Sequence, residues 1–467
     1  MSLVISEVTI IDGVVDRPIE GHSIWIEGGR IKAIGRRDEI GVPPGANLID
    51  ARGKYAIPGL MNANVHLLMD IRLENLARYV GEYEELIAEA AQVALKSGLT
   101  TVFDTWGPRR YLMTVRDRIE AGKTVGSRIF CAGNIIGLEG PFSQDFLPKH
   151  LEAASAALVQ RINAIWVENV GRHLLWLPPD QVAREVRSYI SKGIDFIKYA
   201  SNDHAPGAFL AFSPRVQALM VEQAHLAGIT AQAHTMSVEG LRIAIEAGCD
   251  IIQHANITGP VPIPNTTLVL MAERRTGAVI FPFTKAAFEW ILENLPDERR
   301  TMWHASDTNA RNLIRSGVPL LLANDGAISA PEAVADPSRC TSWAGVPEDN
   351  LIDLRTGHFA WFKAMEEKGC SPIEMLRAAT RNIAVAYGKD NDLGTLEPGK
   401  IADILILDKN PLQAAANYRA IHMIIKNGVI IDREALPINP MLTKPMEPPT
   451  EEDACYVPFL VSCNKVP

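Results

Sequence analysis

Polar side chains end several apolar runs of this sequence, and their types are those that hold divalent metals. Imidazole is a preferred ligand of zinc and neighbouring metals, and amide and carboxylate oxygens also bind such ions. Strand side chains alternate between two faces, so the N-x-H at 64–66 points both side chains the same way. A single histidine here is more often a satisfied core residue, but two in succession favour a metal site. The candidate ligands are Asn64, His66, Lys198, His234, His254 and Asp325.

Lys198 is the unusual member, because it stands inside the apolar run 193–200. An unpaired ammonium in a buried strand is costly unless it is neutralised, paired or chemically altered. One alteration that fits is the addition of carbon dioxide to the deprotonated amine, which gives a carbamate with an anionic oxygen ligand. A buried salt bridge is the alternative that this run leaves open.

Asp325 ends the almost wholly apolar run 317–325, so its carboxylate must face a metal, a partner or water. Beside a metal it can accept a proton from an activated water and return it to a leaving amine, which makes it the candidate base and acid. His254 is the second catalytic candidate, since it or His358 could polarise a carbonyl oxygen by hydrogen bonding. An N-cap of the following helix is the other interpretation of Asp325.

The elements that must position these residues alternate between strands and helices. Apolar residues at helical spacing mark 82–96, 214–227 and 238–247, each followed by a glycine and an apolar strand. Such βα units imply a parallel sheet, and a (β/α)8 barrel is its natural closure. In a barrel, reactive groups gather at the carboxyl ends of the strands, where the candidates are expected to lie.

Both ends of the chain carry a different pattern, of short strands separated by turns. Strands are expected at 8–11, 23–27 and 31–35, and again at 402–407 and 421–426. Neither set can stand alone, so the two are expected to pair into a small β-sandwich. The predicted domains are the first part of the sandwich at 1–57, the barrel at 58–390, the second part of the sandwich at 391–432 and a Pro-rich tail at 433–467.

Length and composition exclude several classes of protein. The 467 residues suit a barrel of about 250 to 400 residues with one accessory domain. The net charge of -9, without a dense Lys/Arg block, argues against nucleic-acid binding. No signal peptide and no apolar run of about 18 residues is found, which predicts a cytoplasmic protein with no membrane partner. The six cysteines show no CxxC spacing, so histidines and carboxylates must hold any metal.

Taken together, these residues resemble the amidohydrolase superfamily. The resemblance rests on the candidates in their order along the chain, on the segment 56–66 and on the closing motifs 371–380 and 394–404, and it spans roughly residues 4 to 430. The first strand of that family normally ends in H-x-H, whereas Asn64 occupies the first position here. This departure is similar to that of bacterial phenylurea hydrolases and the related molinate, or thiocarbamate, hydrolase.

The resemblance implies metal-dependent cleavage of a carbon-nitrogen bond in a phenylurea, which yields an aniline and a carbamic acid. It implies one or two divalent metals per subunit, with zinc first and cobalt or manganese as alternatives. The better site would consist of the Lys198 carbamate, His234 and His254. A second position would be framed by His66, Asn64 and Asp325, and the amide would weaken it.

Three alternatives stay open. The same site could hydrolyse a thiocarbamate. It could also serve a Xaa-Pro dipeptidase or cyclic amidase, for which Arg109 or Arg110 would clamp a carboxylate. The remote alternative is a metal-free, non-catalytic scaffold, which only Asn64 favours.

A small aryl substrate needs an apolar pocket with few polar groups. The candidate contacts, taken from strand ends and the loops that follow them, are Trp106, Phe142, Tyr199 and His204. Aromatic residues also fill the interfaces between barrel and helices, so a core position is the alternative for the aromatic ones, and a solvated loop position for His204. The flanking sandwich and the Pro-rich tail suit subunit contacts, so a homo-oligomer is expected.

Overall fold

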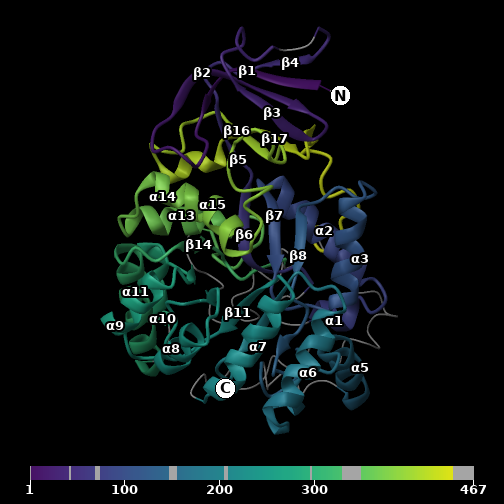
Figure 1. The fold of residues 1–467 in the computed structure, drawn as a ribbon, viewed down its shortest axis with the longest axis vertical. Coiled ribbons are helices and arrows are strands. Elements are labelled where there is room, and N and C mark those ends of the chain that lie inside the picture. The colour runs from purple at the N-terminus through teal and green to yellow at the C-terminus, as the bar shows by residue number, and fades with distance from the viewer. Residues whose placement is uncertain are drawn as a thin grey trace.

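The computed structural model describes residues 2–41, 44–68, 74–146, 155–204, 209–294, 297–328 and 349–444. Figure 1 shows a sheet at one end of the molecule and, beyond it, strands surrounded by helices. Most of the predicted Pro-rich tail, from 445 onward, lies outside the described residues.

Strands from both ends of the chain form one eight-stranded sheet, at the top of Figure 1. Its order is β18-β17-β16-β5-β1-β2-β3, and β4 pairs with β1. The strands are β1 (Ser2–Ile10), β2 (Ile19–Glu27), β3 (Arg30–Gly35), β4 (Asn47–Asp50), β5 (Tyr55–Pro58), β16 (Ile404–Leu407), β17 (Ile421–Lys426) and β18 (Val429–Ile430).

The two chain ends pair as the sequence predicted. β16 runs antiparallel to β5, with Ile404 opposite Pro58, and β5 runs parallel to β1. Buried apolar residues such as Leu3, Ile5 and Ile24 give this sheet a core cluster of its own. The strands belong to a single sheet, and the two-layer sandwich stays a prediction.

Two parallel sheets carry the predicted site residues. The six-stranded sheet has the order β14-β13-β12-β11-β10-β9, and the four-stranded sheet has the order β15-β6-β7-β8. The strands are β6 (Leu60–His66), β7 (Leu99–Asp104), β8 (Arg128–Cys131), β9 (Ile135–Ile136), β10 (Phe196–Ala200), β11 (Thr230–His234), β12 (Ile251–Gln253), β13 (Gly277–Ile280), β14 (Leu320–Leu322) and β15 (Gly326–Ala327). The predicted mixed α/β class with parallel strands is therefore confirmed.

These two parallel sheets are linked on both sides. β15 follows β14 in the chain and pairs with β6, with Gly326 opposite Val65. On the other side, the Asp195 amide donates to the carbonyl of Cys131, the last residue of β8, over 3.0 Å. The strands are buried on both faces, which explains why they read as apolar runs without strict alternation.

Helices lie around the parallel strands (Figure 1). α2 (Tyr83–Lys96), α7 (Pro214–Leu226) and α8 (Val238–Glu246) match the predicted helices. Ser213 caps α7 by accepting the Val216 amide, and Gly98, with φ of 97°, ends α2 and turns the chain into β7. The others are α1 (Glu74–Arg78), α3 (Arg109–Glu120), α5 (Ala156–Val167), α6 (Pro179–Ile190), α9 (Asn265–Glu273), α10 (Lys285–Asn294), α11 (Asp297–Arg315), α13 (Gly357–Glu367), α14 (Pro372–Ala378) and α15 (Arg381–Ala386), with 3-10 turns η1 (Arg172–Trp176) and η2 (Ala415–Arg419). Within the described ranges, none of the helices has the length and apolarity that crossing a bilayer requires.

The described part of the C-terminal segment is tied to α2. The buried carboxylate of Glu89 accepts the backbone amides of Met441, Leu442 and Thr443 at 2.8–2.9 Å and the Thr443 hydroxyl at 2.7 Å. Lys96, at the end of the same helix, donates to the Leu436 carbonyl. A single acidic side chain therefore satisfies three successive backbone donors.

Replacing Glu89 by alanine should release this segment. Each buried amide left without an acceptor costs about 1–3 kcal/mol. We expect hydrogen exchange of the 441–443 amides to accelerate by at least about tenfold, as measured by mass spectrometry. Glu85→Ala, at an exposed position of the same helix, is the matched control. Unchanged protection in the Glu89 variant would contradict the assignment.

Candidate active site

The six residues predicted to bind a metal lie at or near the carboxyl ends of neighbouring parallel strands. Parallel pairing brings these ends to one edge of each sheet, so side chains distant in sequence can meet there. All six are buried or half-buried. They are Asn64 and His66 of β6, Lys198 of β10, His234 at the end of β11, His254 just after β12, and Asp325 between β14 and β15.

Four of these side chains form two hydrogen-bonded pairs. His66 Nε2 lies 3.0 Å from Asp325 Oδ1, and His254 Nε2 lies 2.9 Å from His234 Nδ1. Among the described residues, no group of three or more His, Cys, Asp and Glu side chains forms a ready-made metal cluster. The hydrogen bonds thus lie within each pair, and a metal site shared by both pairs stays a prediction.

Burial controls the charges of this site. It lowers the pKa of His254 to about 3 and, together with the neighbouring imidazoles, that of His234 well below its usual value. Burial also lowers the pKa of Lys198 to about 8, against the opposing charges of Asp325 and Asp104. For Asp325 burial acts to raise the pKa, but His66, Lys198 and His254 hold it well below its usual value. The site thus combines neutral imidazoles, an ionised carboxylate and a lysine that is easily deprotonated.

Several ring nitrogens at this site are buried without a hydrogen-bond partner. Most buried polar atoms in proteins are paired, so such a group requires an explanation. Neutral imidazole nitrogens and a carboxylate are the donors that zinc and neighbouring metals prefer. The donor chemistry therefore fits a divalent cation. The unpaired atoms are His66 Nδ1, His204 Nδ1, His234 Nε2 and His254 Nδ1.

The backbone is strained at two of the candidates. His254 has φ of 38° and Asp325 has φ of 52°, a left-handed region that side-chain-bearing residues seldom adopt. Such strain concentrates at functional sites, where the surrounding structure enforces it. Next to Asp325, the Asn324 amide accepts from Asn62 at 2.6 Å and donates to the Asp353 carbonyl at 3.1 Å. The sequence analysis did not name Asn62 and Asn324 as residues of the site. Their signals were the alternating N-x-N-x-H at 62–66 and the Asn that directly precedes Asp325.

The predicted substrate residue His204 lies within an aromatic series beside the ligands. Its ring stacks on His234 with centroids 5.0 Å apart, and Phe146 meets it edge-on at 4.8 Å. Phe146 also meets Trp106 edge-on at 4.8 Å, and Trp106 packs against His66. Trp106 is buried and donates to Asn134, so Phe146, half-buried, is the more accessible aromatic face. Sequence reasoning missed Phe146, which shares a loop with the predicted Phe142.

The other two predicted substrate residues lie deeper. Phe142 is 2% exposed, and its backbone carbonyl and amide both bond to the Asn163 side chain. Tyr199 is fully buried and neighbours Lys198 on β10, so it faces the opposite side of that strand, beside Cys249. Substrate contact by Phe142 or Tyr199 stays a prediction.

Asp104, at the end of β7, is a buried carboxylate of the site that was not among the candidates. It accepts the Leu67 amide at 2.8 Å and the Trp106 amide at 3.2 Å, which joins the ends of β6 and β7. Burial raises its pKa to about 6, although His66 lowers it in part. Its signal was the one used for Asp325, an aspartate that ends an apolar run.

Two residues weighed for other roles have partners of their own. His358 Nε2 lies 3.1 Å from the carbonyl of Ser97, which follows α2. Arg109 forms an ion pair with Glu168 at 2.8 Å and donates to the Lys192 carbonyl. Its charge is therefore already compensated, which does not favour a clamp for a substrate carboxylate.

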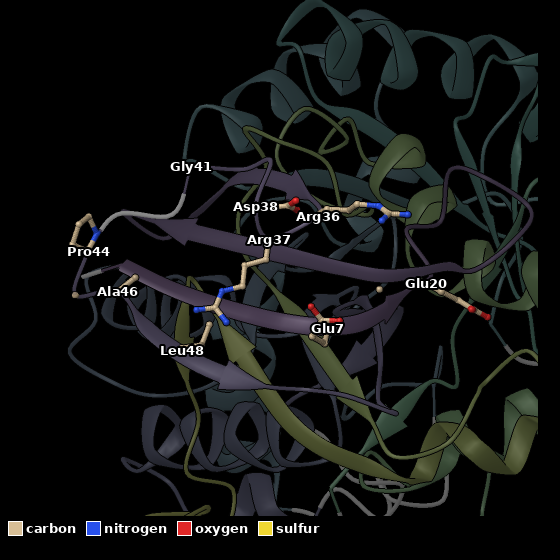
Figure 2. Close-up of a pocket in the computed structure, with 11 residues that line it drawn as sticks. Glu7, Glu20, Arg36, Arg37, Asp38, Gly41, Pro44, Ala46 and Leu48 are labelled. Atoms are coloured by element: carbon tan, nitrogen blue, oxygen red, sulfur yellow. The ribbon is translucent and has the colours of Figure 1, made fainter.

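A hollow of about 1000 Å³ lies on the terminal sheet, away from the candidate site (Figure 2). Charged side chains of both signs line it, and they are Glu7, Glu20, Asp38, Arg36 and Arg37. None of the site residues lines it.

Comparison with known proteins places this arrangement in a family. The solved structure of molinate hydrolase has a TM-score of 0.89 and 36% identity, and the match covers 96% of this chain and 98% of the other. Phenylurea hydrolase B also has a TM-score of 0.89 and 36% identity, with 95% and 100% covered. Ochratoxinase of Aspergillus niger is 25% identical over 378 residues, 76% of this chain and 71% of its own.

The family model described as "Amidohydrolase family" matches residues 55–431, which include all the candidate ligands. The predicted resemblance to this family, and within it to phenylurea hydrolase and molinate hydrolase, is thereby confirmed. The chain belongs to the amidohydrolase family.

Proposed function

We propose that the protein is a metal-dependent hydrolase that cleaves a carbon-nitrogen bond of a phenylurea-type substrate. The single observation that carries the proposal is that the strand ends bring together the pairs His66–Asp325 and His234–His254, with Lys198 among the groups that lower the pKa of Asp325. The 36% identity to phenylurea hydrolase B over nearly the whole chain supports the substrate class. The products would be an aniline and a carbamic acid.

The fold in which we place this chemistry is a closed (β/α)8 barrel at 58–390, flanked by a sandwich formed by 1–57 and 391–432. Support comes from the links that join the two parallel sheets on both sides. The tail at 433–467 forms the last unit of this division. A homo-oligomer and a cytoplasmic location complete the proposal, and the free, buried thiols of Cys131, Cys249 and Cys370 accord with a reducing compartment.

We assign the metal to two positions at the strand ends. The Lys198 carbamate, His234 and His254 would hold the first, and His66 and Asp325, with Asn64 as the predicted third residue, would frame the second. When bound, zinc, or alternatively cobalt or manganese, would polarise the carbonyl of the substrate and make a water more acidic. Whether one or two ions bind depends on the second position.

The protein's own groups supply the proton transfers. Asp325 is ionised, so it can accept the proton of the attacking water and pass it to the departing amine. Both nitrogens of a urea donate electron density to the carbonyl, so protonation of the leaving nitrogen is needed for cleavage. His254, whose Nδ1 is unpaired, is the second catalytic group, as a ligand or as a donor to the carbonyl oxygen. Phe146 and His204 would border the aryl ring.

The second candidate function is thiocarbamate hydrolysis, because molinate hydrolase is as similar to this chain as phenylurea hydrolase B. A Xaa-Pro dipeptidase or cyclic amidase is less favoured, since the Arg109 charge is paired with Glu168. The metal-free scaffold is the least favoured function. Without a metal, the buried imidazole nitrogens that lack hydrogen-bond partners would destabilise the fold with nothing to offset the cost.

A substrate panel tests this ranking. Phenylureas, thiocarbamates and Xaa-Pro dipeptides are incubated with the metal-loaded protein, and product formation is followed by chromatography. We expect turnover of N-aryl ureas with release of the aniline. Turnover of dipeptides but not ureas would overturn the proposal. A protein that holds no metal and is not activated by zinc or cobalt would support the scaffold.

Asp325→Asn should lower kcat by about 10²–10⁴-fold, the usual contribution of a general base and acid. The amide keeps the size of the side chain, so the circular dichroism spectrum and melting temperature should stay near the wild-type values. Asp117→Asn, an exposed residue paired with Arg116, is the matched control and should keep full activity. A wild-type rate in the Asp325 variant would remove Asp325 from the mechanism.

The metal-free protein should lose stability as the pH falls from 7 to 5. In the unfolded chain the imidazoles take up protons near pH 6.5, whereas His254 and His204, with pKa values lowered to about 3 and about 4 by burial, stay neutral when folded. Protonation then favours the unfolded state, by about 2 kcal/mol at pH 5 for a buried imidazole such as His254. Thermal melts of apo-protein check this, and His204→Phe should show a shallower decline. A melting temperature independent of pH in this range would contradict the assignment.

A further inference from the structure

A continuous series of buried hydrogen bonds begins at Lys198 and passes beneath the candidate site. Lys198 Nζ donates to Thr105 Oγ1 at 3.0 Å, and Thr105 Oγ1 donates to Asn64 Oδ1 at 2.6 Å. Asn64 Nδ2 donates to Gln253 Oε1 at 2.9 Å. These side chains are 0–3% exposed, so water does not compete for the bonds.

The series continues across two further residues to a backbone carbonyl. Gln253 Nε2 donates to Gln232 Oε1, and Gln232 Nε2 donates to the Tyr387 hydroxyl at 3.1 Å. Tyr387 in turn donates to the Ala63 carbonyl at 2.7 Å. The Tyr387 ring is held by stacking on Phe103, with centroids 3.7 Å apart.

The carbonyl at the end fixes the direction of every bond. A backbone carbonyl can only accept a hydrogen bond, so the Tyr387 hydroxyl must donate its single O–H to the Ala63 carbonyl. Towards Gln232 the same hydroxyl oxygen can then only accept. Each amide is then oriented in turn, with its NH2 group towards Tyr387 and its oxygen towards Lys198. At the far end, the Asn64 oxygen accepts the hydrogen bond of the Thr105 hydroxyl. The Thr105 oxygen therefore presents lone pairs, and no hydrogen, to Lys198.

We infer that Thr105 is a positioning residue for Lys198. Its hydroxyl oxygen accepts one N–H of the lysine nitrogen, and the remaining substituents of that nitrogen are thereby directed towards the proposed metal position. The inference rests on the proposed function, because it concerns how the carbamate is oriented. Asn64 then acts as a link in the series, since both polar atoms of its amide are engaged within the protein.

The chemistry of carbamate formation agrees with this geometry. The lone pair of the neutral Lys198 amine attacks the carbon of carbon dioxide, and a carbon-nitrogen bond forms while one C=O electron pair moves to oxygen. The nitrogen loses one proton to solvent and keeps one N–H beside the new carboxylate group. The remaining N–H can donate a hydrogen bond to the Thr105 oxygen. The series of hydrogen bonds is therefore the same before and after carbon dioxide is added.

Thr105→Val and Thr105→Ser form a matched pair of variants, because valine keeps the shape and serine keeps the hydroxyl. Metal-free protein is incubated with ¹³C-bicarbonate, and the carbamate signal is measured by NMR, with Lys198→Met identifying the signal of this lysine. Zinc retained per chain after dialysis is the second readout. We expect Thr105→Val to lose carbamate and zinc by about tenfold or more, since a buried donor is left without its acceptor, and Thr105→Ser to retain both.

Tyr387→Phe provides a remote test, because it removes the terminal hydroxyl and keeps the stacked ring. Without that hydroxyl the direction of the series is no longer fixed, so a smaller loss of carbamate is expected. Thermal melts identify any variant that fails to fold, and Tyr387→Phe then decides. If both Thr105→Val and Tyr387→Phe form carbamate and retain zinc at wild-type levels, this inference is overturned, whereas the proposed function is not. No Lys198 carbamate and no bound zinc in the wild-type protein would overturn the proposed metal site together with it.

Discussion

The parallel register of the strands is the constraint on which the candidate site depends. Gly326 lies opposite Val65, and this pairing sets Asp325 beside His66, although 259 residues separate them in sequence. In the six-stranded sheet, Ala200 lies opposite His234. A slip of one residue would turn every side chain of the slipped strand to the opposite face of the sheet. The site is therefore encoded in the pairing of strands as much as in its residues.

Burial then selects which groups keep a charge. Lys198, His234 and His254 are buried, and their charged forms are disfavoured there. Burial acts to raise the pKa of Asp325, but His66, which lies 3.0 Å from its carboxylate, leads the groups that hold that pKa well below its usual value. The same burial that makes an ammonium costly eases deprotonation of the Lys198 amine, which is the form that can react with carbon dioxide. One physical effect thus favours the neutral forms of the imidazoles and of the lysine, which the proposed metal site would need.

The sequence predicted what local patterns encode. Helices such as 238–247, the pairing of the chain ends and the parallel α/β class followed from periodicity and glycine positions. Hydrogen bonds join His66 to Asp325 and His234 to His254, whereas the common metal site predicted from the strand ends stays a prediction. Asp104 ends an apolar run as Asp325 does, and Asn324 directly precedes Asp325, so their positions could have been found from the sequence. Phe146 could not, because a loop aromatic that meets an imidazole has no periodic signature.

The buried amides show why composition alone misleads at this position. Strands of parallel sheets that are buried on both faces are commonly filled by branched apolar residues. In this protein Asn64, Gln232 and Gln253 occupy buried strand positions, and each unpaired amide there would cost about 1–3 kcal/mol. The cost is offset because every amide both accepts and donates in a fixed order that starts from the Ala63 carbonyl. A carboxylate at position 64 could not donate to Gln253, and an apolar residue could do neither. The amide of Asn64 satisfies both neighbours, because it donates to Gln253 and accepts from Thr105, independently of whether its oxygen ever meets a metal.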